Sequence, residues 1–311
     1  MKRDFLQVTD FTPAEINETF EIAKKLKQMV RDGVEHHFFK GQSMAMIFSK
    51  PSARTRISFE TGMFQFGGHA LYLGPNDIGI GKRESVKDIA RVISGYNNWI
   101  MARLFEHIHM LELAQYATVP VINGLTDYNH PCQIMADMLT IQEHRGTVEG
   151  QKVVFIGDGN NVFNSFLNFA TLFPYHLVIA GPKGYEPNAE IVDRARRAGI
   201  SEIEIFHDPV AAVKDADVLY TDVWTSMGQE AESQQRLADF AAFQINSELL
   251  SHAKSDAIVM HCLPAHYGEE ITEEVIDSPQ SVVFDEAENR MHAQKAVMVM
   301  LAKSMGAEIE I

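Results

Sequence analysis

Long apolar runs, cysteine and positive charge are all scarce in this sequence. No apolar run approaches the ~20 residues that a helix needs to cross a bilayer, which argues against a helical membrane protein. The first residues, Met1 to Phe5, become acidic and amphipathic at once and do not read as a signal peptide. The only two cysteines, Cys132 and Cys262, lie in different halves of the chain. We therefore expect reduced thiols and a cytoplasmic protein rather than a disulfide.

The shortage of positive charge limits the partners. Lysine and arginine number 27 against 42 acidic residues, a formal net charge of −15. Such a charge argues against nucleic acid or an anionic membrane as the main partner. An anionic substrate would also be repelled by the overall field, so it must be met by a local cluster of arginines. Arginine clusters are therefore informative here.

What the chain does contain is an alternation of short buried strands with helices. With 311 residues and no repeat or long linker, it suits two domains. Alternating βα units imply two doubly wound parallel sheets, an α/β fold. Strands are predicted at Ser43–Phe48, His69–Leu73, Trp99–Leu104, Pro120–Asn123, Lys152–Ile156, His176–Ala180, Glu202–Phe206, Val218–Thr221 and Ala257–His261.

The helices fill the gaps between these strands. We expect a first domain over residues 1–147 and a second over 148–285, with the terminal helix of 286–311 returning to the first domain. The N-terminal helix should pack there too, capped by Thr12 with Pro13 in its first turn. Helices are predicted at Pro13–Arg31, Arg54–Phe66, Glu84–Tyr96, Gln133–His144, Asn161–Phe173 and Glu286–Lys303.

Ligands of such sheets bind at the carboxyl ends of the strands. The segment Ser52-Ala53-Arg54-Thr55-Arg56 follows one strand and opens a helix. Helix N–H groups, two hydroxyls and two arginines there suit a dianionic phosphate. The alternative is a helix cap with two solvated arginines.

Two further features of the first half occupy similar places. Arg103 ends a buried strand, where a charge is either a ligand contact or half of an internal ion pair. In His130-Pro131-Cys132-Gln133, the imidazole and the amide can reach one ligand from a single helical turn. A histidine there could donate to a carbonyl oxygen that becomes negative during attack. Taken alone, however, a histidine before a helix is more often a helix cap or a core histidine.

Three loops of the second half come after strands. Gly157-Asp158-Gly159-Asn160-Asn161 places Val162 where a dinucleotide fingerprint needs its third glycine, so that motif fails. Asp222, followed by Ser226-Met227-Gly228, could grip an amino acid's charged groups, and the polar stretch 229–239 could move as a lid. The third loop, His261-Cys262-Leu263-Pro264, could supply a nucleophile or a polar wall. We expect no metal there, because no second pair of ligands accompanies it.

Together these loops resemble the carbamoyltransferase superfamily, from about Phe5 to Ala302. The segments S-x-R-T-R and H-P-x-Q and the late Ala287-Glu288-Asn289-Arg290 are similar to its carbamoyl-phosphate half. The Asp222 to Gly228 loop and His-Cys-Leu-Pro look like its ornithine branch. The resemblance implies direct carbamoyl transfer from carbamoyl phosphate to ornithine, giving citrulline in arginine or urea-cycle-type metabolism. It implies no cofactor, and a homotrimer or stacked trimers.

The resemblance also assigns roles to individual residues. Arg103, His130, Asp222 and Cys262 would be catalytic. Ornithine would be bound by Asn161, Asp222, Ser226 and Met227. Carbamoyl phosphate would be held by Ser52, Ala53, Arg54, Thr55, Arg103, His130, Gln133, Cys262, Leu263 and Arg290.

The chain departs from the family pattern at two positions. Ala53 stands where many members have a hydroxyl residue, although a backbone contact would survive. Gly79 stands where some relatives place a glutamine that reaches a neighbouring subunit, and the candidates to replace that side chain are Lys82 and Arg83. The rivals are another carbamoyltransferase specificity, a nucleotide-dependent oxidoreductase and a non-catalytic binding protein.

Overall fold

The computed structural model describes residues 2–81, 83–225 and 230–311. The chain forms two compact units, one of Met1–Ala136 with Glu288–Ile311 and the other of Asp137–Ala287. The division falls inside two helices, α6 (Pro131–Arg145) and α13 (Val283–Ser304). Each unit holds one parallel sheet, which confirms the predicted α/β class with two such sheets. Among the described residues, no helix combines the length and the apolar character that crossing a membrane requires.

The sheet of the first unit has the strand order β2-β1-β3-β4. Of its four strands, β1, β3 and β4 are buried along almost their whole length, as strands covered on both faces must be. The chain runs from β1 to one neighbour and then crosses to the other side, so its direction changes between β1 and β3. The strands are β1 (Ser43–Phe48), β2 (His69–Leu73), β3 (Trp99–Arg103) and β4 (Val121–Leu125).

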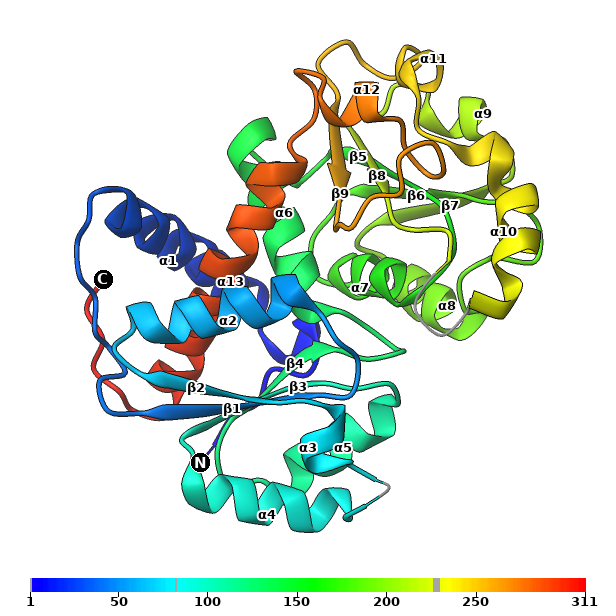
Figure 1. The fold of residues 1–311 in the computed structure, drawn as a ribbon. Coiled ribbons are helices and arrows are strands. Elements are labelled where there is room, and N and C mark those ends of the chain that lie inside the picture. Colours follow the sequence, from blue (N-terminus) through cyan, green and yellow to red (C-terminus); the bar gives the residue numbers. More distant parts are fainter. Residues whose placement is uncertain (1, 82, 226–229) are drawn as a thin grey trace. The chain divides into compact units, whose positions relative to one another are not determined.

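Helices cover both faces of this first sheet. In Figure 1, α1 and α2 lie on the same face as part of α13, while α3, α4 and α5 lie on the other. Helix α1 begins where expected, because Thr12 accepts a hydrogen bond from the Glu15 N–H and Pro13 fills the first turn. The helices are η1 (Val8–Asp10), α1 (Pro13–Arg31), α2 (Ala53–Gln65), α3 (Pro75–Ile78), α4 (Val86–Tyr96) and α5 (His107–Tyr116).

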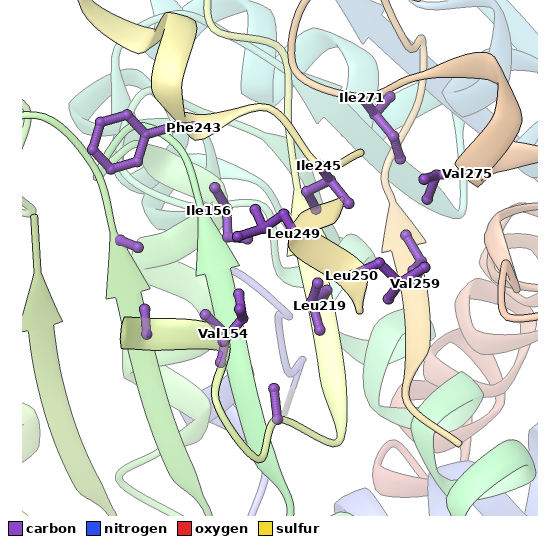
Figure 2. Packing of buried hydrophobic residues seen from close by; sticks show 14 of the residues in the cluster. Val154, Ile156, Leu219, Phe243, Ile245, Leu249, Leu250, Val259, Ile271 and Val275 are labelled. Atoms are coloured by element: carbon purple, nitrogen blue, oxygen red, sulfur yellow. The ribbon is translucent and has the colours of Figure 1, made fainter. Parts of the chain in front are cut away.

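The sheet of the second unit has the order β7-β6-β5-β8-β9, with the change of direction between β5 and β8. Alternate residues of each strand pack on opposite faces. Figure 2 shows one face, where Ile156, Leu219 and Val259 lie with Leu249 and Leu250. The strands are β5 (Lys152–Ile156), β6 (His176–Ala180), β7 (Glu202–Phe206), β8 (Val218–Thr221) and β9 (Ile258–His261).

The opposite face of this sheet carries aromatic side chains. Phe155 stacks on Tyr220 with ring centroids 5.4 Å apart, and Phe166 of α7 meets Tyr220 edge-on at 4.9 Å. The helices are α7 (Asn161–Phe169), α8 (Ala189–Ala198), α9 (Pro209–Val213), η2 (Glu230–Glu232), α10 (Ser233–Phe240), η3 (Ala241–Phe243), α11 (Ser247–Leu250) and α12 (Glu273–Ile276).

The predicted strands lie within one or two residues of the observed ones, whereas two helices differ. Helix α7 ends at Phe169, not at Phe173, because the chain tightens into a turn ahead of Pro174, which cannot continue a helix. Helix α13 begins three residues before the expected Glu286. The polar stretch after residue 229 forms η2 and α10 rather than an open loop.

Candidate active site

The predicted ligand loops lie where each sheet changes direction. In the first unit, Phe48 of β1 pairs with Arg103 of β3, so the loops that follow both strands begin side by side. In the second unit, Thr221 of β8 pairs with Ile156 of β5 on one side and with His261 of β9 on the other. The gap that opens where neighbouring crossovers diverge is the usual ligand site of such sheets.

Only part of the segment Ser52 to Arg56 faces this edge. Ser52 caps α2, where its hydroxyl accepts the N–H of Thr55 at 3.3 Å and donates to the Thr55 hydroxyl at 3.2 Å. Thr55 is buried and Arg54 is half-buried. Arg56, in contrast, is exposed, pairs with Glu60 at 3.0 Å and lies over the ring of Tyr72. The second arginine is therefore a surface ion pair, which the motif alone did not reveal.

Arg290 of α13 connects Thr55 of α2 with Gln133 in the first turn of α6. Its Nη1 donates to Gln133 Oε1 at 2.5 Å, and its Nη2 donates to Thr55 Oγ1 at 3.3 Å. All three side chains are buried.

His130 sits in a cationic environment. Burial is the main cause that holds its pKa well below the usual value, and the charges of Arg290, Arg103 and Lys50 lower it further. The imidazole is therefore neutral at physiological pH and can donate one N–H to an oxygen that gains negative charge. This arrangement suits a ligand that carries both a phosphate, which the three cations attract, and a carbonyl oxygen, to which the neutral imidazole can donate. The three cations also form the local cluster of positive charge that an anionic substrate of this acidic chain requires.

The second unit gathers a carboxylate and a thiol. Asp222 Oδ1 accepts the Cys262 thiol at 3.0 Å and the Val223 N–H at 2.8 Å, while Oδ2 accepts the amide of Asn160 at 2.9 Å. Burial and the charge of Asp222 raise the pKa of the Cys262 thiol well above its ordinary value. A protonated thiol is a poor nucleophile, so the structure favours the polar-wall alternative for Cys262.

Leu263 follows this cysteine in an uncommon conformation. Its φ of +57° is left-handed, and the peptide bond to Pro264 is cis. The Leu263 N–H donates to Nδ1 of His261 at 2.8 Å, so the other ring nitrogen of His261 carries the proton and donates to Glu270 at 2.9 Å. Glu286 accepts the backbone N–H of His261 at 2.9 Å. The loop is thus fixed by buried polar groups, and His261 acts in its support.

The glycines of the loop after β5 have a packing role. A Cβ atom at Gly159 would lie 2.2 Å from the backbone nitrogen of Pro187. Gly157 has a φ of +149°. A Cβ atom at Gly181 would lie 2.5 Å from the carbonyl oxygen of Gly157. These glycines allow close backbone approach inside the protein, so the partial dinucleotide motif does not need a nucleotide to explain it.

The loop also contains a residue that the sequence did not single out. Asn160 caps α7 by accepting the N–H groups of Val162 and Phe163, and the same side chain donates to Asp222. Asn161, which was expected to bind ornithine, is the first residue of that helix and is half-buried. The expected contacts of Ser226 and Met227 lie outside the described residues. Ala53 begins α2, with its side chain exposed.

Gly79, the other departure from the family pattern, ends α3 with a left-handed φ of +54°. A Cβ atom there would lie 2.9 Å from Cβ of Arg83. A side chain at this position would be strained in this conformation. Arg83 is exposed, and Lys82 lies outside the described residues.

Among residues 2–81, 83–225 and 230–311, two groups of side chains could hold a metal ion. They are His176 with Glu202 and Glu204, and His266 with Glu269 and Glu270. Neither group contains a residue expected to touch substrate. Glu270 already serves the histidine that supports the Cys262 loop.

Both halves of the chain match family models. A model described as "Aspartate/ornithine carbamoyltransferase, carbamoyl-P binding domain" matches residues 3–143. A model described as "Aspartate/ornithine carbamoyltransferase, Asp/Orn binding domain" matches residues 149–301. The first contains His130 with Arg103 and Lys50, and the second contains Asp222, Cys262 and Arg290.

Individual relatives are similar over nearly the whole chain. An "Ornithine carbamoyltransferase, chloroplastic" of Pisum sativum is 55% identical over 299 residues, which cover 96% of this chain and 80% of that protein. The solved "Ornithine carbamoyltransferase from Pyrococcus furiosus" is 52% identical with a TM-score of 0.91, and 96% of each chain is covered. The "anabolic ornithine carbamoyltransferase" structure from Campylobacter jejuni is 38% identical with a TM-score of 0.91, covering 98% of this chain and 100% of the other.

Proposed function

Because the chain belongs to the aspartate/ornithine carbamoyltransferase family, we propose that it transfers the carbamoyl group of carbamoyl phosphate to the side-chain amine of L-ornithine. The products are L-citrulline and phosphate. The observation that carries the choice of acceptor is the buried carboxylate of Asp222, held by Asn160 and Cys262. A fixed anion attracts the ammonium groups of ornithine and repels the second carboxylate of an aspartate acceptor.

The first unit binds the donor. The amino end of α2, with Ser52, the backbone of Ala53, Arg54 and Thr55, holds the phosphate together with Arg103. Thr55, Arg103 and His130 polarise the carbonyl oxygen. The cationic surroundings and neutral imidazole of His130 support this role, because they match an oxygen that becomes negative.

The remaining donor contacts surround the carbamoyl group. Gln133 offers its carbonyl to the carbamoyl nitrogen, with Arg290 holding the amide. The backbone of Cys262 and Leu263 offers further acceptors to the same nitrogen. The left-handed Leu263, fixed by His261, supports a loop shaped to present its backbone.

The second unit binds the acceptor. Asn161, Asp222, Ser226 and the Met227 backbone bind the amino-acid end of ornithine, and Cys262 with Asp222 borders its side-chain amine. The thiol need not react. Its raised pKa keeps it protonated, which supports direct attack without a covalent enzyme intermediate.

The proposed transfer needs only proton removal from the amine, orientation of the two substrates and stabilisation of the oxyanion. The side-chain amine, whose reference pKa is ~10.4, loses a proton before it attacks. Its nitrogen then forms a bond to the carbamoyl carbon and the carbon–oxygen bond to phosphate breaks, while the nitrogen gives up a second proton, which the leaving phosphate carries away. Orientation and stabilisation of the oxyanion can each contribute several kcal/mol.

We further propose a homotrimer and a place in arginine biosynthesis in the cytoplasm. Self-association is supported by exposed apolar side chains of the first unit, among them Leu71 of the edge strand β2 and Val92 and Tyr96 of α4. These three residues line a hollow of about 320 Å³. A reducing compartment is supported by the free thiols of Cys132 and Cys262. Sedimentation equilibrium tests the trimer, and Tyr96→Glu should lower the mass toward that of one chain.

The proposed reaction is tested by mixing the purified chain with carbamoyl phosphate and L-ornithine. Citrulline and phosphate should appear in equal amounts and without a burst. Phosphate release with no citrulline would favour hydrolysis, and a stoichiometric burst of phosphate would favour a covalent intermediate. An oxidoreductase is the weaker alternative, since Val162 breaks the dinucleotide motif and packing accounts for Gly159.

A further inference from the structure

Arg236 is the one buried polar residue of α10, a helix that also exposes Gln234 and Gln235 to solvent. Its Nη1 and Nη2 donate to Asp158 Oδ2 at 2.8 and 2.9 Å. Nη1 also donates to the backbone carbonyl of Trp224 at 3.0 Å. The guanidinium lies 4.9 Å from the ring centroid of Tyr185. With 5% of the residue exposed, a charge has been desolvated to make these contacts.

The partners of Arg236 come from three separate loops. Asp158 follows β5, Tyr185 follows β6 and Trp224 follows β8. Aromatic contacts hold the same group together, because Phe240 of α10 packs on Tyr185 at 4.7 Å and on Trp224 at 5.8 Å. Helix α10 therefore joins three strand ends through a single guanidinium.

Two of these loops determine where Asp222 points. Asp158 and Asn160 belong to one turn, in which the Asn160 N–H donates to the Asp158 carbonyl at 2.7 Å. Asn160 in turn donates to Asp222 Oδ2. On the other side, Trp224 lies two residues after Asp222. Arg236 thus fixes the segments on both sides of the carboxylate while Asp222 itself remains available.

We propose that Arg236 is a positioning residue for the acceptor site: it ties Asp158 to the Trp224 carbonyl and so holds the Asp222 carboxylate in place for the substrate's amine. The assignment rests on the proposed function for the identity of the substrate. Arg236 touches no reacting atom in this account. Its loss should weaken ornithine binding more than carbamoyl-phosphate binding, since the residues proposed to hold the phosphate and the carbonyl oxygen belong to the other unit.

Asp158 gives the contact a pH dependence. Burial raises the pKa of this carboxyl to about 6 in spite of the charge of Arg236, and the charges of Asp222 and Glu232 raise it too. The other groups at the contact are the Tyr185 phenol, which donates to Asp239, and the weakly paired Glu232. Below pH 6 Asp158 takes up a proton, and the charge-assisted bonds to Arg236 weaken.

The first test compares Arg236→Gln with Arg197→Gln, the same substitution at an exposed arginine of α8. We expect the KM for ornithine to rise at least tenfold in Arg236→Gln, the KM for carbamoyl phosphate to stay within twofold, and kcat to fall less than the ornithine KM rises. Arg197→Gln should behave as wild type. An unchanged ornithine KM, or an equal rise in both KM values, would overturn the proposal.

The second test uses Asp158→Asn, which keeps an acceptor for Arg236 and removes the charge. The ratio of its ornithine KM to that of the wild type should be well above one at pH 8. It should approach one as the pH falls through 6, where the wild type loses the same charge. A ratio that does not change with pH would contradict the inferred role. If Arg236→Gln fails to fold, the single variants Asp158→Asn and Arg236→Lys replace it as tests of the proposal.

A third measurement separates this inference from the proposed function. Amide hydrogen exchange without substrate should be faster at the Val223 N–H in Arg236→Gln than in Arg197→Gln, because Asp222 is less firmly held. Unchanged exchange would contradict the positioning role even if the enzyme makes citrulline. If the wild type makes no citrulline but exchange at Val223 is faster in Arg236→Gln, the proposed substrate is wrong. The positioning of Asp222 by Arg236 is then still supported.

Discussion

The thiol of Cys262 donates a hydrogen bond to Asp222 Oδ1 across 3.0 Å. The two residues immediately follow the paired ends of neighbouring parallel strands, β8 and β9, so the sheet itself brings them together. Each affects the other. The carboxylate keeps the thiol protonated, and the thiol is a second donor to Oδ1 beside the Val223 N–H. Cys262 therefore shapes the acceptor site without needing to act as a nucleophile.

Removing the carboxylate should abolish use of ornithine. In Asp222→Ala we expect kcat/KM for ornithine to fall at least ~100-fold, which corresponds to the loss of a charge-assisted hydrogen bond of roughly 3 kcal/mol. The KM for carbamoyl phosphate should change little. Steady-state kinetics with each substrate varied in turn measures both. Near-normal kinetics with ornithine would remove Asp222 from the site.

The reactivity of Cys262 tests the electrostatic part of this relationship. Since the charge of Asp222 raises the pKa of the thiol, Asp222→Asn should lower that pKa and increase the thiolate fraction at a given pH. We expect iodoacetamide to alkylate Cys262 slowly in the wild type and faster in Asp222→Asn at pH 8. Peptide mass spectrometry distinguishes it from Cys132, whose buried thiol has its pKa raised to about 12. Equal rates at Cys262 in the two proteins would count against the predicted coupling.

The two arginines of the segment after β1 should differ in function. Arg54→Ala should raise the KM for carbamoyl phosphate by about 10- to 100-fold, the range expected for a lost charged contact to phosphate. Arg56→Ala is the matched control, because Arg56 pairs with Glu60 at the surface. It should stay within about twofold, as exposed ion pairs contribute little. A larger effect at Arg56 than at Arg54 would reverse the assignment.

Lys295 should give the first unit a stability that depends on pH. Burial lowers the pKa of its ammonium to about 7, while its amine still donates to His36 and Gln65. Between about pH 7 and the unfolded-state value near 10.5, the unfolded chain binds a proton that the folded chain does not. Stability therefore rises with pH in this window, and below it the buried charge is a constant penalty.

The rise attributable to Lys295 is at most about 1.4 kcal/mol per pH unit. Urea unfolding of the wild type and of Lys295→Met at pH 7 and pH 9 isolates it, since other titrating groups are common to both proteins. The wild type should gain more stability than Lys295→Met between the two pH values. Parallel curves would show that Lys295 is not titrating in this range.

The sequence predicted the strands well for a physical reason. In a parallel sheet covered on both faces, core strands such as Ser43–Phe48 are continuous apolar runs, which contrast sharply with the loops that follow. The ligand loops then come at the strand ends, so the loops that contain Thr55, His130, Asp222 and Cys262 could be singled out from their positions, whereas the roles of these residues came from the family resemblance.

What the sequence did not reveal depends on contacts between distant residues. Arg236 lies 78 residues from Asp158, and nothing in its own polar helix distinguishes it from a solvated arginine. Asn160 and Asn161 are equivalent in a motif, but only the helix cap geometry directs Asn160 to Asp222. Arg56 was overvalued for the converse reason, because its partner Glu60 is a helical neighbour that the motif does not include.

The most direct test of the central claim compares four acceptors with carbamoyl phosphate as the common donor. Formation of the ureido product from L-ornithine, putrescine, L-aspartate and N-acetyl-L-ornithine is measured as kcat/KM for the purified chain. We expect a preference for L-ornithine of at least ~100-fold over each of the others, because L-aspartate adds a carboxylate that Asp222 repels, N-acetyl-L-ornithine lacks the α-ammonium group and putrescine lacks the α-carboxylate. An equal or higher kcat/KM with any other acceptor, or no ureido product from any of them, would contradict it.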